Sequence, residues 1–184
     1  HPIKNNNTFL LHKKGWSGVN IDLDENNIAL FNYFRPKDDN IHAAISDKIE
    51  ELDLYFYHKK SPINTLDEKI SLKQNAKIER KIKVKTETLT NILDKIQVLN
   101  IDLLSIDVEG FELRVIQGLN FEKYSPNVIV IEYLDLEAEK WEIPYNNIDN
   151  IINSKIYKYI ISKNYKFVNW VNGDLVFVKN NFKN

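Results

Sequence analysis

The stretch from Leu103 to Leu119 constrains the fold of this chain more than any other. Its sequence is LLSIDVEGFELRVIQGL. The largely apolar run Leu103–Ile106 is typical of a strand buried in a parallel sheet, and the residues after Gly110 place apolar side chains along one side of a helix. Asp107 and Glu109 stand between the two patterns. The stretch therefore predicts a strand that ends at two carboxylates, turns at a glycine and continues as a helix.

Two interpretations of this turn are open at the level of the motif. Open α/β sheets bind their ligands beyond the carboxyl ends of the strands, so Asp107 and Glu109 would lie at a functional edge. Acidic residues are also common at helix N-termini, where they cap the helix and complement its dipole. Evidence from the rest of the chain is needed to distinguish a functional site from a helix cap.

Composition limits the class of protein. With 184 residues, 43% of them apolar, the chain has the material for one core, and we expect a single domain over residues 1–184. The 25 basic and 26 acidic residues nearly cancel, so no overall field favours nucleic acid or an anionic membrane. Cysteine is absent, and no apolar run approaches the roughly 18 residues that span a bilayer. We expect a soluble, cytoplasmic protein.

Periodicity predicts alternating helices and strands. The expected helices cover residues 8–15, 24–34, 88–96, 111–119 and 148–163. The expected strands cover residues 16–22, 40–47, 52–57, 82–85, 103–106, 128–133 and a final hairpin, 165–171 and 174–179. Residues 58–80 are polar and are expected to form a variable insertion. The order predicts an α/β fold whose mostly parallel, twisted sheet ends in an antiparallel hairpin.

Acidic residues follow several of these strands. Asp22, Asp47 and Glu132 stand at strand ends, as Asp107 does. Because parallel strands share one carboxyl edge, these acids are expected to converge there. Asp22 is placed to bind ribose hydroxyls, and Asp47, after Ser46, to meet an adenine amine. The alternatives are solvated loop acids and, for Glu132, a salt bridge to a neighbouring basic residue.

Four segments, taken in order, resemble the successive blocks of the FkbM family of S-adenosylmethionine-dependent methyltransferases. They are GWSGVNID at 15–22, AISD at 44–47, SIDVEGFE at 105–112 and VIVIE at 128–132. The resemblance runs from His1 to about Val178 and is most specific in the third segment. It implies a Rossmann-like methyltransferase fold with helices on both faces of the sheet. It also implies that the substrates are hydroxyl groups of sugars, glycans, polyketides or other secondary metabolites.

The chain departs from the family pattern at its start. Members have a first strand and an Asp-x-Gly-Ala type turn that holds the methionine part of the cofactor, whereas this chain begins at His1 and Pro2. We expect the domain to be N-terminally incomplete here. We also expect residues 1–8 to continue the cofactor loop, with His1 as a cofactor contact.

Methyl transfer to a hydroxyl needs a group that takes its proton. Asp107 and Glu109 are the candidate catalytic residues, and Asp107 also lies where it would contact the cofactor. Alternatively, these two acids and Glu132 would hold Mg²⁺ or Mn²⁺ as oxygen ligands, although no residue is assigned as a metal ligand. The acceptor is expected to contact His58, Glu132 and Tyr133. Nothing in the sequence identifies the acceptor or the oligomeric state.

Two other functions stay open. An acid after the second strand also serves NAD(P)-dependent oxidoreductases, but the chain contains no Gly-x-Gly-x-x-Gly motif. A non-catalytic module that binds a partner through the loops of the same fold is the third possibility. Binding of S-adenosylhomocysteine or of NAD separates these functions.

Overall fold

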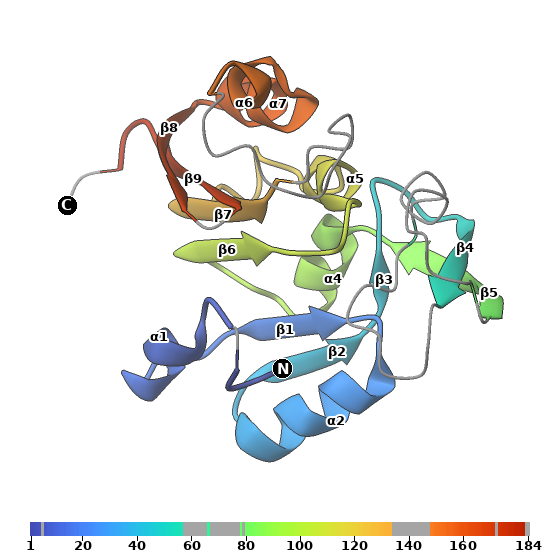
Figure 1. Cartoon of the computed structure of the whole chain (residues 1–184). Helices are drawn as coiled ribbons and strands as arrows, with labels where there is room; N and C mark the ends of the chain where they lie inside the picture. Colours follow the sequence, from blue (N-terminus) through green and yellow to red (C-terminus); the bar gives the residue numbers. More distant parts are fainter. Residues whose placement is uncertain are drawn as a thin grey trace. The chain divides into compact units, whose positions relative to one another are not determined.

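The computed structural model describes residues 1–4, 6–56, 66, 78, 80–133, 148–171 and 173–182. The chain divides into two compact units, residues 1–45 and residues 46–184. Each unit combines helices with strands, which confirms the α/β class (Figure 1). The organisation of residues 1–184 as one domain stays a prediction.

The first unit is built around a short βαβ arrangement. It holds α1 (Phe9–Lys13), β1 (Val19–Asp22), α2 (Glu25–Phe34), β2 (Asp39–His42) and β3 (Ala44–Ile45). β1 and β2 pair in parallel, and α2 connects them and lies beside the pair (Figure 1). α2 begins where the Asp24 side chain accepts the N–H of Asn26 at 2.8 Å. The parallel pairing places Asp22 at the carboxyl edge of this small sheet.

A buried arginine fixes the start of the chain within this unit. Arg35 is 2% exposed and follows the last residue of α2. Its guanidinium donates to the carbonyl oxygen of Pro2 at 2.6 Å, to Oδ1 of Asn6 at 2.9 Å and to Oγ1 of Thr8 at 2.8 Å. Burying a guanidinium is costly unless it is hydrogen-bonded. These bonds therefore hold Pro2, Asn6 and Thr8 against the end of α2.

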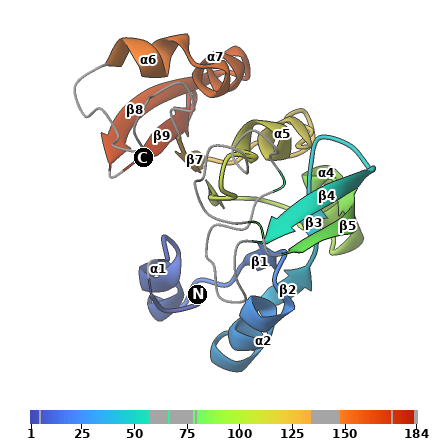
Figure 2. The same ribbon diagram turned by 45° about the vertical axis from the view of Figure 1, so that its right-hand side comes forward.

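The second unit contains the remaining described elements. They are β4 (Glu51–Phe56), β5 (Arg80–Glu87), α4 (Leu89–Lys95), β6 (Leu103–Ile106), α5 (Glu112–Gln117), β7 (Val128–Glu132), α6 (Ile148–Asn153), α7 (Lys155–Ser162), β8 (Tyr165–Val171) and β9 (Asp174–Lys179). β4 and β5 pair antiparallel. α7 packs beside β8, and α6 lies next to α7 (Figure 2).

A four-stranded sheet forms the centre of this unit, in the order β6-β7-β9-β8. β6 and β7 are parallel, and β9 runs antiparallel to both of its neighbours. The inward side chains of the two central strands are fully buried: Ile129, Ile131, Leu175 and Phe177 are each 0% exposed. The C-terminal hairpin predicted from the sequence is confirmed. The carboxyl ends of β6 and β7 therefore lie at one edge of a well-packed sheet.

The described strands form small, mixed sheets, so a single, mostly parallel sheet stays a prediction. Two other expectations need correction. The strand expected over residues 40–47 is broken at Ala43, whose N–H turns to donate to the carbonyl oxygen of Asp22 at 3.1 Å. The helix expected over residues 148–163 is two helices, because the Ser154 side chain accepts the N–H of Tyr157 and caps a second start.

Candidate functional site

The turn after β6 has an uncommon backbone. Glu109 has φ +54° and Gly110 has φ +95°, so two successive residues are in the left-handed region. Glycine adopts this conformation freely, but a glutamate there carries a steric cost, and such residues are enriched at functional sites. The turn predicted from the sequence is present, and its glutamate rather than its glycine is the unusual member.

A second glutamate holds this turn in place. Glu112, the first residue of α5, is 2% exposed. Its Oε1 accepts the N–H of Val108 at 3.0 Å and that of Gly110 at 2.9 Å. Burial raises the pKa of Glu112, although these backbone hydrogen bonds act in the opposite direction. The carboxylate thus satisfies two N–H groups at the start of the helix and fixes the conformation of residues 108–110.

The environment of Glu109 is suited to proton transfer. Its side chain is half-buried. Burial raises the pKa of Glu109 to about 7, and the negative charges of Asp107 and Glu112 add to the increase. A carboxyl with a pKa near 7 is ionised in part at neutral pH and is still basic enough to accept a proton.

Glu132 is the last residue of β7, beside β6. Its Oε2 is buried and has no hydrogen-bond partner among the described residues. Burial raises the pKa of Glu132 to about 9, and repulsion from Asp107, Glu112 and Glu109 contributes further. The salt bridge considered for Glu132 is not seen among the described residues. A buried acceptor without a partner is available to a ligand that donates a hydrogen bond.

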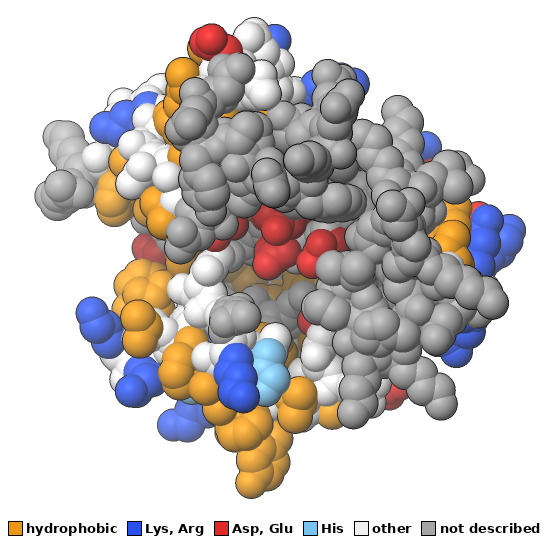
Figure 3. Space-filling view, viewed as in Figure 1, with side chains coloured by type: hydrophobic (Ala, Val, Ile, Leu, Met, Phe, Trp, Pro, Cys, Tyr) orange, Lys and Arg blue, Asp and Glu red, His pale blue; other side chains and the backbone are white. Residues whose placement is uncertain are grey.

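Asp107, Glu109, Glu112 and Glu132 act on one another electrostatically, and we refer to them as the carboxylate cluster. Figure 3 shows acidic side chains gathering near the middle of the face in view. The structure thus brings together the predicted acids of β6 and β7. In the described part of the chain, no three His, Cys, Asp or Glu residues are arranged to hold a metal ion. The arrangement favours a ligand that carries positive charge or hydroxyl groups.

Asp47 lies in the second unit and is engaged by an arginine. Its Oδ1 accepts a hydrogen bond from the Ser46 hydroxyl at 2.9 Å and another from Nε of Arg114 at 2.6 Å. Burial would raise the pKa of Asp47, but these hydrogen bonds and the positive charge of Arg114 outweigh it and lower the pKa. Asp47 is therefore a fixed anion rather than a solvated loop acid.

Asp22 belongs to the first unit. Its Oδ1 accepts the N–H of Asp24 at 2.8 Å, and its Oδ2 accepts a hydrogen bond from the side chain of Asn27 at 3.0 Å. Burial raises the pKa of Asp22 despite these two bonds. Because Asp22 and the carboxylate cluster belong to different units, their convergence stays a prediction.

Of the other residues predicted to contact the cofactor or the acceptor, the structure describes His1 and Tyr133. Nδ1 of His1 accepts the backbone N–H groups of Ile3 and Lys4, each at 3.2 Å. The Tyr133 hydroxyl donates to the carbonyl oxygen of Asn150 at 3.2 Å. His58 lies outside the described residues, as does most of the predicted insertion at 58–80. The roles assigned to these residues stay predictions.

Comparison with known families decides the class of the protein. The family model of the methyltransferase FkbM domain matches residues 2–167, which is most of the chain. The chain belongs to the FkbM methyltransferase family. Neither the comparison with curated proteins nor that with solved structures gave a match.

The range matched in this FkbM methyltransferase contains Asp22, Asp47 and the whole carboxylate cluster. The family resemblance read from the sequence is therefore confirmed. Within the described residues, no helix of the FkbM protein has the length and apolar character needed to cross a membrane.

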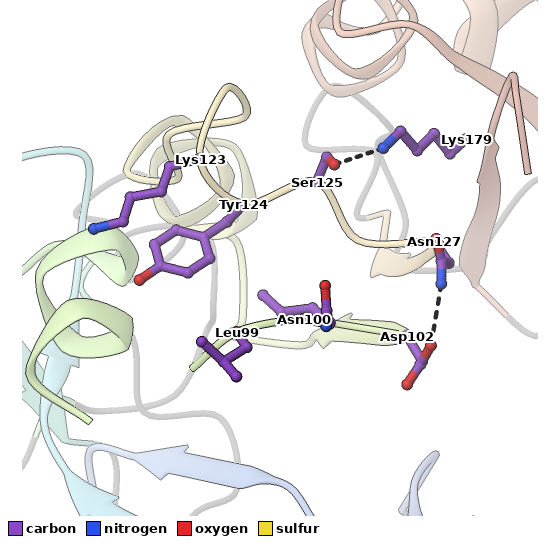
Figure 4. Close-up of a pocket in the computed structure, with 9 residues that line it drawn as sticks. Leu99, Asn100, Asp102, Lys123, Tyr124, Ser125, Asn127 and Lys179 are labelled. Atoms are coloured by element: carbon purple, nitrogen blue, oxygen red, sulfur yellow. Dashed lines mark hydrogen bonds between the residues drawn. The ribbon is translucent and has the colours of Figure 1, made fainter. Parts of the chain in front are cut away.

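A separate cavity of about 340 Å³ lies at the opposite edge of the sheet, before the amino ends of β6 and β7. Figure 4 shows Lys179 reaching Ser125 and Asn127 reaching Asp102 within it. The second lysine of its lining, Lys123, is paired with Asp94 at 2.7 Å. No residue predicted as a site residue of this family member lines this cavity.

Two residues of the site were missed by reasoning from the sequence. The sequence pattern places Glu112 within the SIDVEGFE segment but assigns no role to it or to Arg114. A signal for Glu112 was present, because an acid in the first turn of a helix reaches back to free N–H groups. No local signal pointed to Arg114, since its partner Asp47 is 67 residues away in the chain.

Proposed function

We propose that this protein is an S-adenosylmethionine-dependent O-methyltransferase with Glu109 as its general base. Its acceptor is a hydroxyl group of a sugar, a glycan or a secondary metabolite. The observation that best supports the proposal is Glu109 itself, a half-buried carboxyl at positive φ whose pKa is about 7. The left-handed backbone at Glu109 is a strained conformation of the kind found at functional sites, and together with the burial of its carboxyl it favours a base over a cap.

The charge of the carboxylate cluster fits a cationic cofactor. Burial raises the pKa values of Glu109 and Glu132, and repulsion within the cluster adds to the increase. A neighbouring positive charge would relieve that repulsion. Oε2 of Glu132, which has no hydrogen-bond partner among the described residues, adds an acceptor for a hydroxyl or amine donor. S-adenosylmethionine carries a positive sulfonium and, when bound, supplies a methyl group whose departure needs no proton.

Asp22 and Asp47 are proposed to bind the adenosine part of the cofactor. Each Asp22 oxygen accepts one hydrogen bond from the protein, and a carboxylate oxygen has a second lone pair for a ribose hydroxyl. Asp47, held as an anion by Arg114, is proposed to accept from the adenine amine. His1 remains a proposed cofactor contact through the loop that begins the chain.

The protein's main chemical task is to remove the acceptor's proton. An alcohol oxygen attacks efficiently only as its proton leaves, so Glu109 would take that proton as the oxygen–methyl bond forms. The methyl–sulfur bond would break in the same displacement, and S-adenosylhomocysteine would leave as a neutral thioether. Asp107 is exposed at the end of β6 and is proposed to orient the hydroxyl through a hydrogen bond. Glu132 and Tyr133, next to each other at the end of β7, are proposed to contact the acceptor.

Calorimetric titration of the full-length protein tests the cofactor assignment. S-adenosylhomocysteine should bind and NAD should not. Binding of NAD alone would favour an oxidoreductase, and binding of neither would favour a non-catalytic module. A mass-spectrometric screen for the gain of one CH₂ group, about 14 Da, on candidate sugars, glycans and metabolites then identifies the acceptor, with Glu109→Gln as the low-activity reference.

A further inference from the structure

Arg114 connects helix α5 to the segment that carries Asp47. Its Nε and Nη2 reach the same Oδ1 of Asp47, at 2.6 and 2.5 Å, and Nη2 also pairs with Glu50. The guanidinium lies over the ring of Phe111, 4.9 Å from its centre, and Phe111 is buried. Stacking and the two carboxylates together fix the plane of the guanidinium.

The backbone of the same segment is packed against the end of α5. A Cβ added to Gly118 would lie 2.3 Å from the carbonyl oxygen of Ser46. The Ser46 side chain is buried, and its hydroxyl donates to Oδ1 of Asp47. α5 thus holds Ser46 and Asp47 at two points, through a close backbone contact and through Arg114.

This arrangement leaves one oxygen of Asp47 for a ligand. Among the described residues, every side-chain donor to Asp47 reaches Oδ1. The Asp47 side chain is 33% exposed, so a ligand can approach it. The hydrogen bonds from Arg114 fix the orientation of the Asp47 carboxylate, which supports a positioning role for Arg114.

We propose that Arg114 is a positioning residue for cofactor recognition: it binds Oδ1 of Asp47 and thereby presents Oδ2 to the amino group of adenine. The inference rests on the proposed function, because it concerns how that cofactor is recognised. It predicts that Arg114 contributes to affinity only when the ligand has an amino group to donate.

Two ligands that differ at this group test the inference. In S-inosylhomocysteine an oxygen replaces the adenine amino group, so the base cannot donate to Asp47. Calorimetry should show that wild-type protein prefers S-adenosylhomocysteine to S-inosylhomocysteine. Arg114→Gln should raise the Kd for S-adenosylhomocysteine about tenfold and leave that for S-inosylhomocysteine within about twofold. Arg114→Lys keeps the charge without the planar fork and should give an intermediate loss.

Lys95→Gln is the matched control. It also removes one positive charge that is paired with a carboxylate, Glu87, at 2.6 Å, and it should change neither Kd. An equal loss of affinity for both ligands in Arg114→Gln, or no loss, would overturn the inference while leaving the proposed function intact. If wild-type protein binds neither ligand, the proposed function and the inference both fail.

Discussion

Oε1 of Glu112 lies 2.9 Å from the backbone nitrogen of Gly110 and accepts its hydrogen bond. A buried acid on α5 thereby fixes the turn that carries the proposed base, Glu109. The carboxylate cluster has two kinds of member in consequence. Glu112 accepts hydrogen bonds from the backbone, whereas Glu109 and Glu132 face a ligand in the proposed function.

Glu112→Ala should destabilise the protein by about 2 kcal/mol, because it leaves two N–H groups without their acceptor. It should also lower turnover, since the turn loses its support. Glu112→Gln keeps an acceptor oxygen and should restore most of the stability. Urea denaturation measures both variants. Equal stabilities for Ala and Gln would contradict the role given to the hydrogen bonds.

The rate of methyl transfer should rise with pH and level off above a midpoint near 7, where Glu109 becomes ionised. Glu109→Gln cannot take a proton and should lower kcat/KM by roughly 10²–10⁴-fold, with S-adenosylhomocysteine affinity nearly unchanged. Glu122→Gln, at an exposed position, is the control. If Glu109→Gln keeps the same pH profile and rate, another residue is the base.

Asp107→Asn tests the orienting role. The amide can still hydrogen-bond to a hydroxyl but carries no charge, so turnover should fall by about tenfold or more while S-adenosylhomocysteine affinity stays nearly the same. Steady-state kinetics with calorimetry on the same preparation separate the two effects. A loss of cofactor affinity equal to the loss of turnover would place Asp107 in cofactor binding instead.

Glu132→Gln should stabilise the protein at alkaline pH. The carboxyl has a pKa of about 9 in the folded protein against 4.5 ordinarily, so the folded state holds the proton more tightly. The contribution of the protonated Glu132 to the free energy of unfolding is therefore fully present below pH 4.5 and is lost as the pH rises toward 9. At pH 9 the variant should gain about 1.4 kcal/mol or more, the free energy of one pKa unit. Thermal denaturation between pH 5 and 9 measures this.

Glu51→Gln, at an exposed position, is the matched control for that experiment and should leave the pH dependence of stability unchanged. A Glu132→Gln variant whose stability falls with pH as steeply as that of the wild type would show that Glu132 is not the source of the slope.

Local patterns predicted the elements that carry the site. β6, the turn at Gly110 and α5 lie where the stretch from Leu103 to Leu119 indicated, because strand burial and helical periodicity are properties of neighbouring residues. The break at Ser154 was missed, since the apolar spacing continues across it and only the side-chain cap separates the two helices.

The sequence predicted which acidic residues lie at the site, but not the role of each one. Burial raises the pKa of Glu109, and burial depends on packing that no local pattern records. Likewise, Asp47 was identified from its place after a strand, but its ion pair with Arg114 joins distant parts of the chain. Residue types at strand ends therefore predict the location of a site better than they predict the role of each residue in it.

Gly118→Ala should weaken both stability and cofactor binding. The added Cβ would lie 2.3 Å from a backbone oxygen of Ser46, which cannot move without shifting Asp47. We expect a loss of about 1–3 kcal/mol in stability and a raised Kd for S-adenosylhomocysteine. Gly18→Ala is the matched control, because nothing lies within 4 Å of its added Cβ. Urea denaturation measures the free energy of unfolding of both variants, and calorimetry measures their Kd for S-adenosylhomocysteine. Equal and small changes in the two variants would mean that the approach of α5 to Ser46 does not position the site.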